Sequence, residues 1–360
     1  MRPISALFAS LVLAGAAAGA SAEVTKTLKA ELSADPSRPF RVENLVGHMV
    51  VRQGPGSKVV VIATVHGHDQ ATVDLLRLEE VRDSKTGHPT LRMRYPIDQH
   101  TNYRYGRRAE GGFFEKFFSG KNNVDYDGAR LSVSASSGLA LYADLVVEIP
   151  RGASGTFKNA VGALDGNDVD GTLRFDAGSG VISLRGFKGD VTADTGSGDV
   201  NGLNGQGTFK CDTGSGTCTV NGFRGDQLWL DTGSGDVKVN DASATRVNAD
   251  TGSGSVLLNL GDAEEIKADT GSGDVSIEVS GTGLTRIKAD TGSGSVNLKV
   301  PQNIGFEMLA DVGRGEVSSS FADATAIMKR REVKGYRRGD LKVKIVVDTG
   351  SGDVHIGASR

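Results

Sequence analysis

Repeated aspartates are the first feature of this sequence that could do chemistry. Residues 228–235 read Leu-Trp-Leu-Asp-Thr-Gly-Ser-Gly, and apolar residues before Asp-Thr-Gly are how aspartic proteases present the two carboxyls that share one proton. That reaction needs two such loops facing each other across a cleft between two lobes. Here the segment recurs every 18 to 21 residues between Asp194 and Asp290. This spacing is too short for a lobe, so the pattern argues against a protease.

Metal binding is a second possible chemistry. His66 and His68 stand two residues apart at the end of an apolar run, next to Asp69, and such imidazoles share one face of a strand. No third histidine follows nearby, so a polar corner explains them equally. Calcium-binding repeats also build solenoids from glycine and aspartate, but here the motif occurs once per repeat and leaves half of the ligands unaccounted for. We assign no catalytic, metal or cofactor residues, with structural calcium along the aspartates as the alternative.

The only two cysteines, Cys211 and Cys218, flank one of the repeated segments. Other repeats carry alanine or leucine at the first position and valine at the second, so both cysteines replace inward-facing core residues. In an oxidising compartment the pair can form a disulfide. The alternative is two buried thiols that pack as small apolar residues. The spacing is not the Cys-x-x-Cys of a catalytic dithiol.

A basic segment interrupts the repeats near the C-terminal end of the sequence. Between Asp311 and Asp348 the 37-residue interval has room for two coils or for one coil with an insertion, and the motif-free stretch 318–340 favours the insertion. Its side chains could contact an anionic lipid or polysaccharide surface, or they could form the solvated surface of a capping segment. The residues of this possible contact are Lys329, Arg330, Arg331, Lys334, Arg337 and Arg338.

The repeated pentapeptide predicts the fold. Asp-Thr-Gly-Ser-Gly occurs seven times and two diverged copies begin at Asp176 and Asp311, so a small unit is stacked on itself. Apolar residues alternate on both sides of each copy, as in half-buried strands. We therefore predict an all-β, right-handed parallel β-helix (β-solenoid) of about 18–21 residues per coil with irregular caps. The turn ladder would comprise Asp176, Asp194, Asp212, Asp231, Asp250, Asp269, Asp290, Asp311 and Asp348.

Stacking brings identical charges close together. Ladder aspartates about 4.8 Å apart repel one another, so they must accept N–H groups, bind cations or hold protons. The residue after the motif alternates between acidic and neutral, which spaces those charges two rungs, or about 10 Å, apart. In chain order these residues are Asp199, Thr217, Asp236, Ser255, Asp274, Ser295 and Glu316.

The first residues indicate export. Arg2, an apolar stretch and the small residues 20–22 form a secretory signal peptide cleaved after Ala22. No later stretch has 18 consecutive apolar residues, so we expect no transmembrane segment in the mature chain. Glycine numbers 50 of 360 residues and proline only 8, which excludes collagen and fits many tight β-turns. The predicted organisation is a signal peptide (1–22), a linker (23–37), a β-rich N-terminal part of the solenoid (38–150) with an irregular insertion (96–130), and the repeat solenoid (151–357).

The lead-in DLVVEIPRG (144–152), the tandem DTGSGDV segments and the last DTGSGDVHI (348–356) together resemble the bacterial putative-adhesin family. These are domains of unknown function related to the head domains of autotransporter adhesins. The resemblance covers residues 38–357, implies a right-handed parallel β-helix and supplies no catalytic residues.

We therefore expect a non-catalytic, adhesin-like binding or scaffold protein that is periplasmic, secreted or on the cell surface. Its partner would be an envelope component or a polysaccharide, and no nucleic acid. The alternative is a carbohydrate-active β-helix enzyme that acts on envelope or extracellular polysaccharide. Such an enzyme needs an Asp, Glu, Arg and Lys cluster confined to a few adjacent coils. The outward residues look near-identical from coil to coil, which argues against a localised site.

Overall fold

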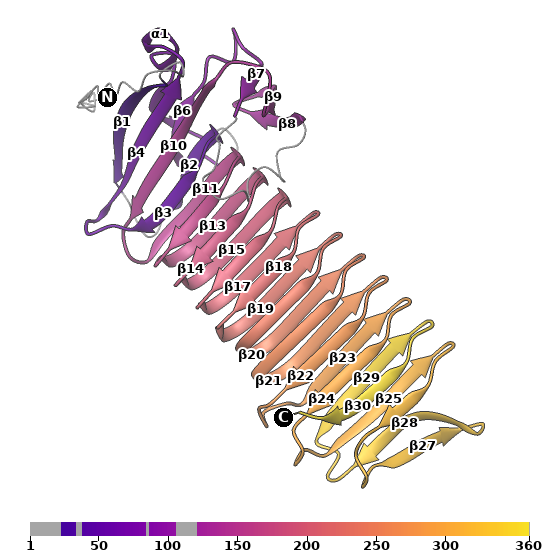
Figure 1. The fold of residues 1–360 in the computed structure, drawn as a ribbon. Coiled ribbons are helices and arrows are strands. Elements are labelled where there is room, and N and C mark those ends of the chain that lie inside the picture. Colours follow the sequence, from indigo (N-terminus) through magenta and orange to yellow (C-terminus); the bar gives the residue numbers. More distant parts are fainter. Residues whose placement is uncertain (1–22, 34–37, 84–85, 106–120, 360) are drawn as a thin grey trace. The chain divides into compact units, whose positions relative to one another are not determined.

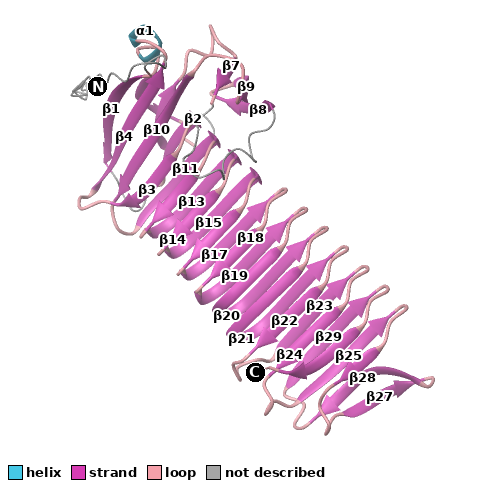
Figure 2. Ribbon diagram, viewed as in Figure 1, coloured by secondary structure: helices cyan, strands magenta, loops and turns pink. Residues whose placement is uncertain are grey.

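The computed structural model describes residues 23–33, 38–83, 86–105 and 121–359, and within these ranges the chain consists of strands with one short helix (Figures 1 and 2). The chain divides into two compact units, Met1–Gly198 and Asp199–Arg360. The predicted signal peptide, 1–22, lies outside the described residues, as do residues 106–120 of the predicted insertion. Within the described ranges, none of the helical structure has the length and apolar character needed to cross a membrane.

Two stacks of parallel strands form the regular part of the first unit. Neighbouring strands pair in register, so that Phe157 lies beside Phe175 and Asp176 beside Asp194. Side chains alternate between buried and outward positions along each strand, as the period of a strand requires. One stack contains, in spatial order, β6 (Pro89–Arg94), β2 (Phe40–Val46), β11 (Ala153–Val161), β13 (Asp170–Ser179) and β15 (Lys188–Ser197). The other contains β10 (Leu141–Ile149), β3 (Met49–Gln53), β12 (Leu164–Asn167) and β14 (Ile182–Arg185).

Antiparallel strands replace the solenoid pattern at the N-terminal side of both stacks. β4 (Lys58–Gly67) pairs antiparallel with β10 on one edge and with β1 (Val24–Ser33) on the other. β5 (Arg77–Arg82) pairs antiparallel with β6. The helix α1 (Gln70–Val73) follows β4, and Asp69 caps its first turn.

The prediction that residues 23–37 form a linker is wrong for most of that segment. Ten of these residues form β1, which buries Leu28 and Leu32 and pairs along its whole length with β4. The sequence carries a strand signal here, because Leu28, Ala30 and Leu32 alternate with Lys29 and Glu31, and the prediction of a linker overlooked it.

The predicted irregular insertion, 96–130, contributes to a small sheet of its own. Tyr103 is fully buried there. The three strands of this sheet, in spatial order, are β7 (Asn102–Arg104), β9 (Ala129–Ser134) and β8 (Lys121–Tyr126).

In the second unit each coil contributes one strand to each of two parallel sheets. We call the sheet whose strands end in Asp-Thr the ladder sheet, and the other the opposite sheet. Inward valine, leucine, isoleucine and alanine side chains of both sheets form the core. The regular coils of the ladder sheet are β17 (Gln206–Thr213), β19 (Arg224–Thr232), the second halves of β20 (Val237–Thr251) and β21 (Val256–Thr270), and β23 (Arg286–Thr291). Those of the opposite sheet are β16 (Val200–Leu203), β18 (Cys218–Asn221), the first halves of β20 and β21, β22 (Val275–Val279) and β24 (Val296–Val300).

The last coils are not stacked in chain order. The final strands β29 (Val343–Thr349) and β30 (Val354–Ala358) lie between the coil of β23 and β24 and the coil of β25 (Phe306–Val312) and β26 (Val317–Ser319). Figure 1 shows these yellow strands between orange ones. The insertion contains β27 (Thr325–Lys329) and β28 (Glu332–Arg338), which form a hairpin. Because β28 pairs antiparallel with the outer edge of β25, the hairpin covers the end of the ladder sheet and turns the chain back.

Candidate binding surface

The aspartates of the repeated pentapeptide form an ordered ladder in each unit. In the first unit Asp176 is the register partner of Asp194. Parallel strands lie about 4.8 Å apart, so carboxyls on adjacent rungs are close neighbours. In the second unit the spatial order of register partners is Asp212, Asp231, Asp250, Asp269, Asp290, Asp348 and Asp311.

Burial and mutual repulsion make several ladder carboxyls hold their protons more tightly than ordinary aspartates. Burial raises the pKa of Asp250, and the charge of Asp269 raises it further. Burial is also the largest cause of the raised pKa values of Asp176, Asp231 and Asp290. Among the described residues, no group of three or more His, Cys, Asp or Glu side chains is arranged to hold a metal ion.

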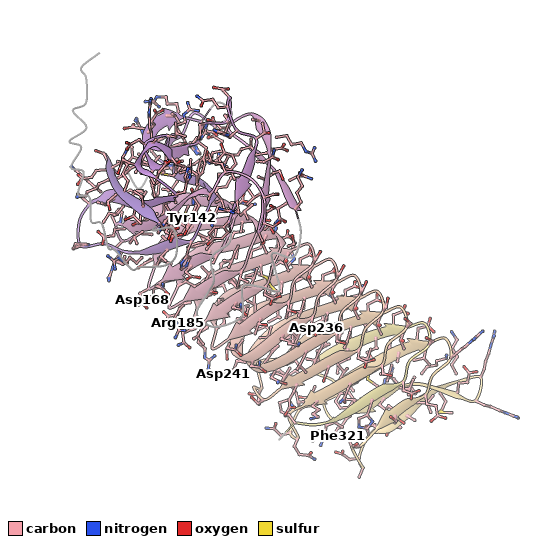
Figure 3. The ribbon with its side chains drawn as sticks, turned by 45° about the horizontal axis from the view of Figure 1, so that its top comes forward. Tyr142, Asp168, Arg185, Asp236, Asp241 and Phe321 are labelled. Carbon is pink, nitrogen blue, oxygen red and sulfur yellow. A yellow bond between two sulfur atoms is a disulfide. The ribbon has the colours of Figure 1, made fainter. Side chains whose placement is uncertain are left out.

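A second acidic row, which follows the pentapeptide, is electrostatically different. The carboxylate of Asp236 accepts the backbone N–H of Ser255 at 3.0 Å and contacts the ammonium of Lys238 at 2.8 Å. The Lys238 and Ser255 hydrogen bonds lower the pKa of Asp236. Figure 3 labels this residue. Asp199, Asp274 and Asp353 likewise accept a backbone N–H from the next coil.

These bonds explain the acidic and neutral alternation more fully than charge spacing does, since Asp199, Asp236 and Asp274 each accept the N–H of the neutral residue on the next rung. The alternation ends where the last coil is inserted. Asp353 lies next to Glu316 and accepts its backbone N–H at 2.9 Å.

Threonine and glycine of the pentapeptide hold adjacent coils together. The hydroxyl of Thr251 donates to the carbonyl of Gly235 in the preceding coil at 2.7 Å and accepts the N–H of Gly254 in its own turn at 3.1 Å. This threonine is almost fully buried. A Cβ on Gly252 would lie 2.5 Å from the carbonyl oxygen of Gly233, closer than real Cβ atoms approach. The turn thus needs glycine because stacked backbones crowd there.

Cys211 and Cys218 form a disulfide across one turn of the solenoid, with their Cα atoms 6.6 Å apart. Both are fully buried. Cys211 is the register partner of Leu230 and Cys218 of Val237, so the bond replaces an ordinary layer of the core. Both cysteines therefore form part of the core, and neither is exposed as a reactive thiol.

The two histidines of the possible metal pair turn to different partners. The ring of His66 stacks on Tyr142 with 4.5 Å between ring centroids, and its Nε2 lies 3.3 Å from Asp144. The ring of His68 instead lies 3.0 Å from the hydroxyl of Thr72. The structure therefore does not bring the two imidazoles together as ligands of one ion.

The six basic residues of the possible anionic-surface contact divide into two groups. Arg337 pairs with Glu307 and Arg338 with Asp323, each at 2.7 Å, and Lys334 lies 3.2 Å from Glu332. Arg338 also stacks over the ring of Phe321, which is labelled in Figure 3. The remaining three, at the tip of the β27–β28 hairpin, are exposed: Lys329, Arg330 and Arg331.

An open groove of about 440 Å³ lies on the outward face of the ladder sheet, across strands β19 to β23. It is lined by one aromatic ring and by charged side chains of both signs. We call it the Trp229 groove. Its outward side chains are Gln227, Trp229, Arg246, Asn248, Glu265, Lys267, Arg286 and Lys288.

The expectation that outward residues are near-identical from coil to coil is wrong on this face. The position two residues before the ladder aspartate holds Lys210, Trp229, Asn248 and Lys267 in successive coils. The sequence contained this signal, because Trp229 is the only tryptophan and stands between two inward leucines. The alternation that buries those leucines must turn the indole outward.

The family model described as Toastrack DUF4097 matches residues 143–357. Three solved structures are similar over most of both chains. A putative adhesin from Parabacteroides distasonis has 12% identity, covers 91% of this chain and 97% of its own, and has a TM-score of 0.40. A putative lipid binding protein from the same organism has 13% identity, covers 92% of this chain and 96% of its own, and has a TM-score of 0.39. A putative adhesin from Bacteroides fragilis has 12% identity, covers 92% of this chain and 97% of its own, and has a TM-score of 0.32. No curated protein matches the sequence.

Proposed function

We propose, for a chain that belongs to the Toastrack DUF4097 family, a non-catalytic role in binding at the cell envelope. The solenoid acts as a rigid scaffold, and the tip of the β27–β28 hairpin attaches it to an anionic surface. The observation that carries this proposal is the exposure of three consecutive cationic side chains at a fixed point of the fold.

Ion pairs and strand pairing attach the hairpin to the solenoid at the end opposite its tip. Arg337 and Arg338 donate to Glu307 and Asp323, and β28 pairs with β25 along four residues. At the tip Arg330 and Arg331 adopt positive φ angles of 51° and 71°, which close the turn. The arginines where the hairpin joins the solenoid thus form ion pairs within the protein, whereas the cationic side chains of the tip are exposed to solvent.

The tip also presents an apolar side chain beside its charges. Met328 has 56% of its surface exposed and immediately precedes Lys329. A long apolar side chain next to cations suits the boundary between lipid headgroups and acyl chains. Each basic residue near an anionic membrane contributes about 1 kcal/mol, so three contribute about 3 kcal/mol, or roughly a 100-fold gain in affinity.

Vesicle flotation tests this proposal. We expect the protein to float with vesicles of anionic phospholipid at low salt, to be released by high salt, and to ignore vesicles of neutral phospholipid. The triple variant K329Q/R330Q/R331Q should lose flotation. A control variant with the same charge change, K188Q/K238Q/K299Q, should retain it. Equal binding by the two variants would contradict the role of the hairpin.

Three finer features of the proposal rest on the sequence. Export rests on the signal peptide, 1–22. A right-handed coil rests on the strong preference of parallel crossovers for that hand. Kinship with the head domains of autotransporter adhesins rests on the repeated DTGSGDV segments.

One observation favours the enzyme alternative, a carbohydrate-active β-helix. Glu265 is the register partner of Arg246 on one side and of Arg286 on the other. These residues form a cluster of one carboxylate and two guanidinium groups that is confined to three coils. Incubation with acidic polysaccharides, followed by an assay for new reducing ends and unsaturated products, distinguishes the two functions. A binding protein leaves the chain length of the polymer unchanged.

A further inference from the structure

We propose that the Trp229 groove binds a linear polysaccharide in which acidic sugars alternate with neutral ones. The proposal concerns a different surface from the hairpin tip and does not depend on it. It rests on three features of the ladder sheet: an exposed indole, two guanidinium groups two rungs apart that make no ion pair with the described residues, and a carboxylate on the rung between them.

The indole of Trp229 provides an apolar platform on an otherwise polar face. Leu228 and Leu230 point into the core, so the strand turns Trp229 outward, and 37% of its surface is exposed. Lys210 of the preceding coil lies 4.2 Å from the ring centroid and supports the ring through a cation–π contact. The face of an aromatic ring carries partial negative charge and attracts the polarised C–H groups of a sugar ring.

The guanidinium groups of Arg246 and Arg286 provide the charge. Among the described residues neither makes an ion pair within 4.0 Å, although Glu265 is the register partner of both. A planar guanidinium binds a carboxylate through two parallel hydrogen bonds, which adds direction as well as affinity. The two side chains project from strands two rungs apart, a separation of about 10 Å.

Glu265 determines which anionic polymer fits between the two arginines. A chain with a negative charge on every unit would place one charge against this carboxylate, and like charges opposed in this way repel. A neutral sugar at the same position can donate hydroxyl hydrogen bonds to the carboxylate instead. The order Arg246, Glu265, Arg286 therefore favours an acidic, neutral, acidic sequence of sugars along the solenoid axis. Single-stranded nucleic acid, which carries a phosphate on every nucleotide, fits this order poorly.

The lysines of the groove separate this site from the aspartate ladder. Lys267 lies 3.8 Å from Asp269 and Lys288 lies 3.9 Å from Asp290. These long contacts leave both ammonium groups able to bind an anionic ligand. The groove is lined by four cations, Arg246, Lys267, Arg286 and Lys288, and by one acid, so its own charge is positive.

Fluorescence tests the proposal directly, because Trp229 is the only tryptophan in the chain. We would titrate the full chain with hyaluronan oligosaccharides, which alternate a uronate with an uncharged amino sugar derivative. We expect a saturable change of emission that weakens at high salt. Methyl esters of the same oligosaccharides, which keep the sugars and lose the charge, should bind at least about tenfold more weakly.

Matched variants then locate the site. R246Q/R286Q should weaken binding by at least about tenfold, whereas K238Q/K299Q, with the same charge change on the opposite sheet, should bind like the unaltered protein. Calorimetry with W229F gives a readout that does not need the indole signal, and circular dichroism verifies that each variant is folded. K329Q/R330Q/R331Q should titrate normally, so a failure of the hairpin proposal is distinguishable from a failure of this one.

Three results would overturn the proposal: full binding by R246Q/R286Q, equal binding of the methyl esters, or tighter binding of oligo(dT) or of polygalacturonate than of hyaluronan. Tighter binding of oligo(dT) or of polygalacturonate would show that the groove selects a ligand by its charge density and not by the alternation of charged and neutral units.

Discussion

The two acidic rows of the solenoid should respond oppositely to removal of charge, although they run along the same coils. Asp250 belongs to the ladder, where burial and Asp269 raise its pKa. Asp236 belongs to the second row, where Lys238 and the N–H of Ser255 lower its pKa. We expect D250N to stabilise the protein at neutral pH and D236N to destabilise it.

The magnitude follows from the ladder spacing. Asp250 has Asp231 and Asp269 as register partners, one on each side and about 4.8 Å away. Like charges directly opposed on neighbouring strands cost roughly 0.2–1 kcal/mol per pair, and partial exposure screens them towards the lower end. D250N should therefore raise the free energy of unfolding by about 0.5–1 kcal/mol, which corresponds to a rise in Tm of about 1–4 °C.

The sign of each effect sets its pH dependence. The folded state binds the proton of Asp250 more tightly than the unfolded state does, so the cost of its charge is present above the raised folded pKa. That cost disappears as the pH falls towards the ordinary aspartate value of about 3.9. The contribution of Asp236 is stabilising above that ordinary value and is lost as the pH falls through its lowered folded pKa.

Thermal unfolding followed by circular dichroism measures both variants. At pH 7.5 and low salt, D250N should melt above the unaltered protein and D236N below it. The gain of D250N should shrink at pH 4 and in 0.5 M salt, because protonation and screening remove the same repulsion. If both variants shift Tm in the same direction at pH 7.5, the electrostatic distinction between the rows is refuted.

Three further perturbations probe the stacking. T251V removes the donor to Gly235 and the acceptor of the Gly254 N–H, so unfolding in urea should show a loss of about 2 kcal/mol; an unchanged midpoint would contradict the role of the threonine. Reduction of the Cys211 disulfide should lower stability by about 2–3 kcal/mol from the entropy of its short loop, measured with and without a reductant. A chain that ends after Arg338 lacks the inserted coil, and we expect faster amide hydrogen exchange in the strands on both sides of the gap; unchanged protection there would argue against the insertion.

The sequence specified the repeating part of this fold because its signals are local. Alternating apolar residues around each pentapeptide predict two strands and an inward face, and the structure places those residues in the core. The place of Trp229 was available from the same alternation. The role of the threonine was not, because its partner, the carbonyl of Gly235, belongs to the preceding coil. A contact between coils becomes visible only when the register between them is known.

The same limit explains why the order of the last coils was missed. The strand β1 is a different case, because Leu28, Ala30 and Leu32 already alternate with Lys29 and Glu31 in the sequence, and pairing with β4 places Leu28 and Leu32 in the core. Among the coils, seven identical pentapeptides offer nearly equivalent neighbours, so local sequence does not choose which copy stacks on which. The connectivity of the chain decides the stacking order, because the hairpin at 325–338 turns the chain back into the solenoid.

A subtler signal for that order does exist in the motif copies. Within the second unit, the copy beginning at Asp311 has lost its threonine to Val312, and it occupies the outermost rung. The last copy in the chain keeps Thr349, which donates to the carbonyl of Gly294 in the rung below. A rung with neighbours on both sides needs that buried bond more than a rung at the end of the stack. In the second unit the degenerate copy thus marks the terminal rung, and on this reasoning V312T should add less stability than T349V removes.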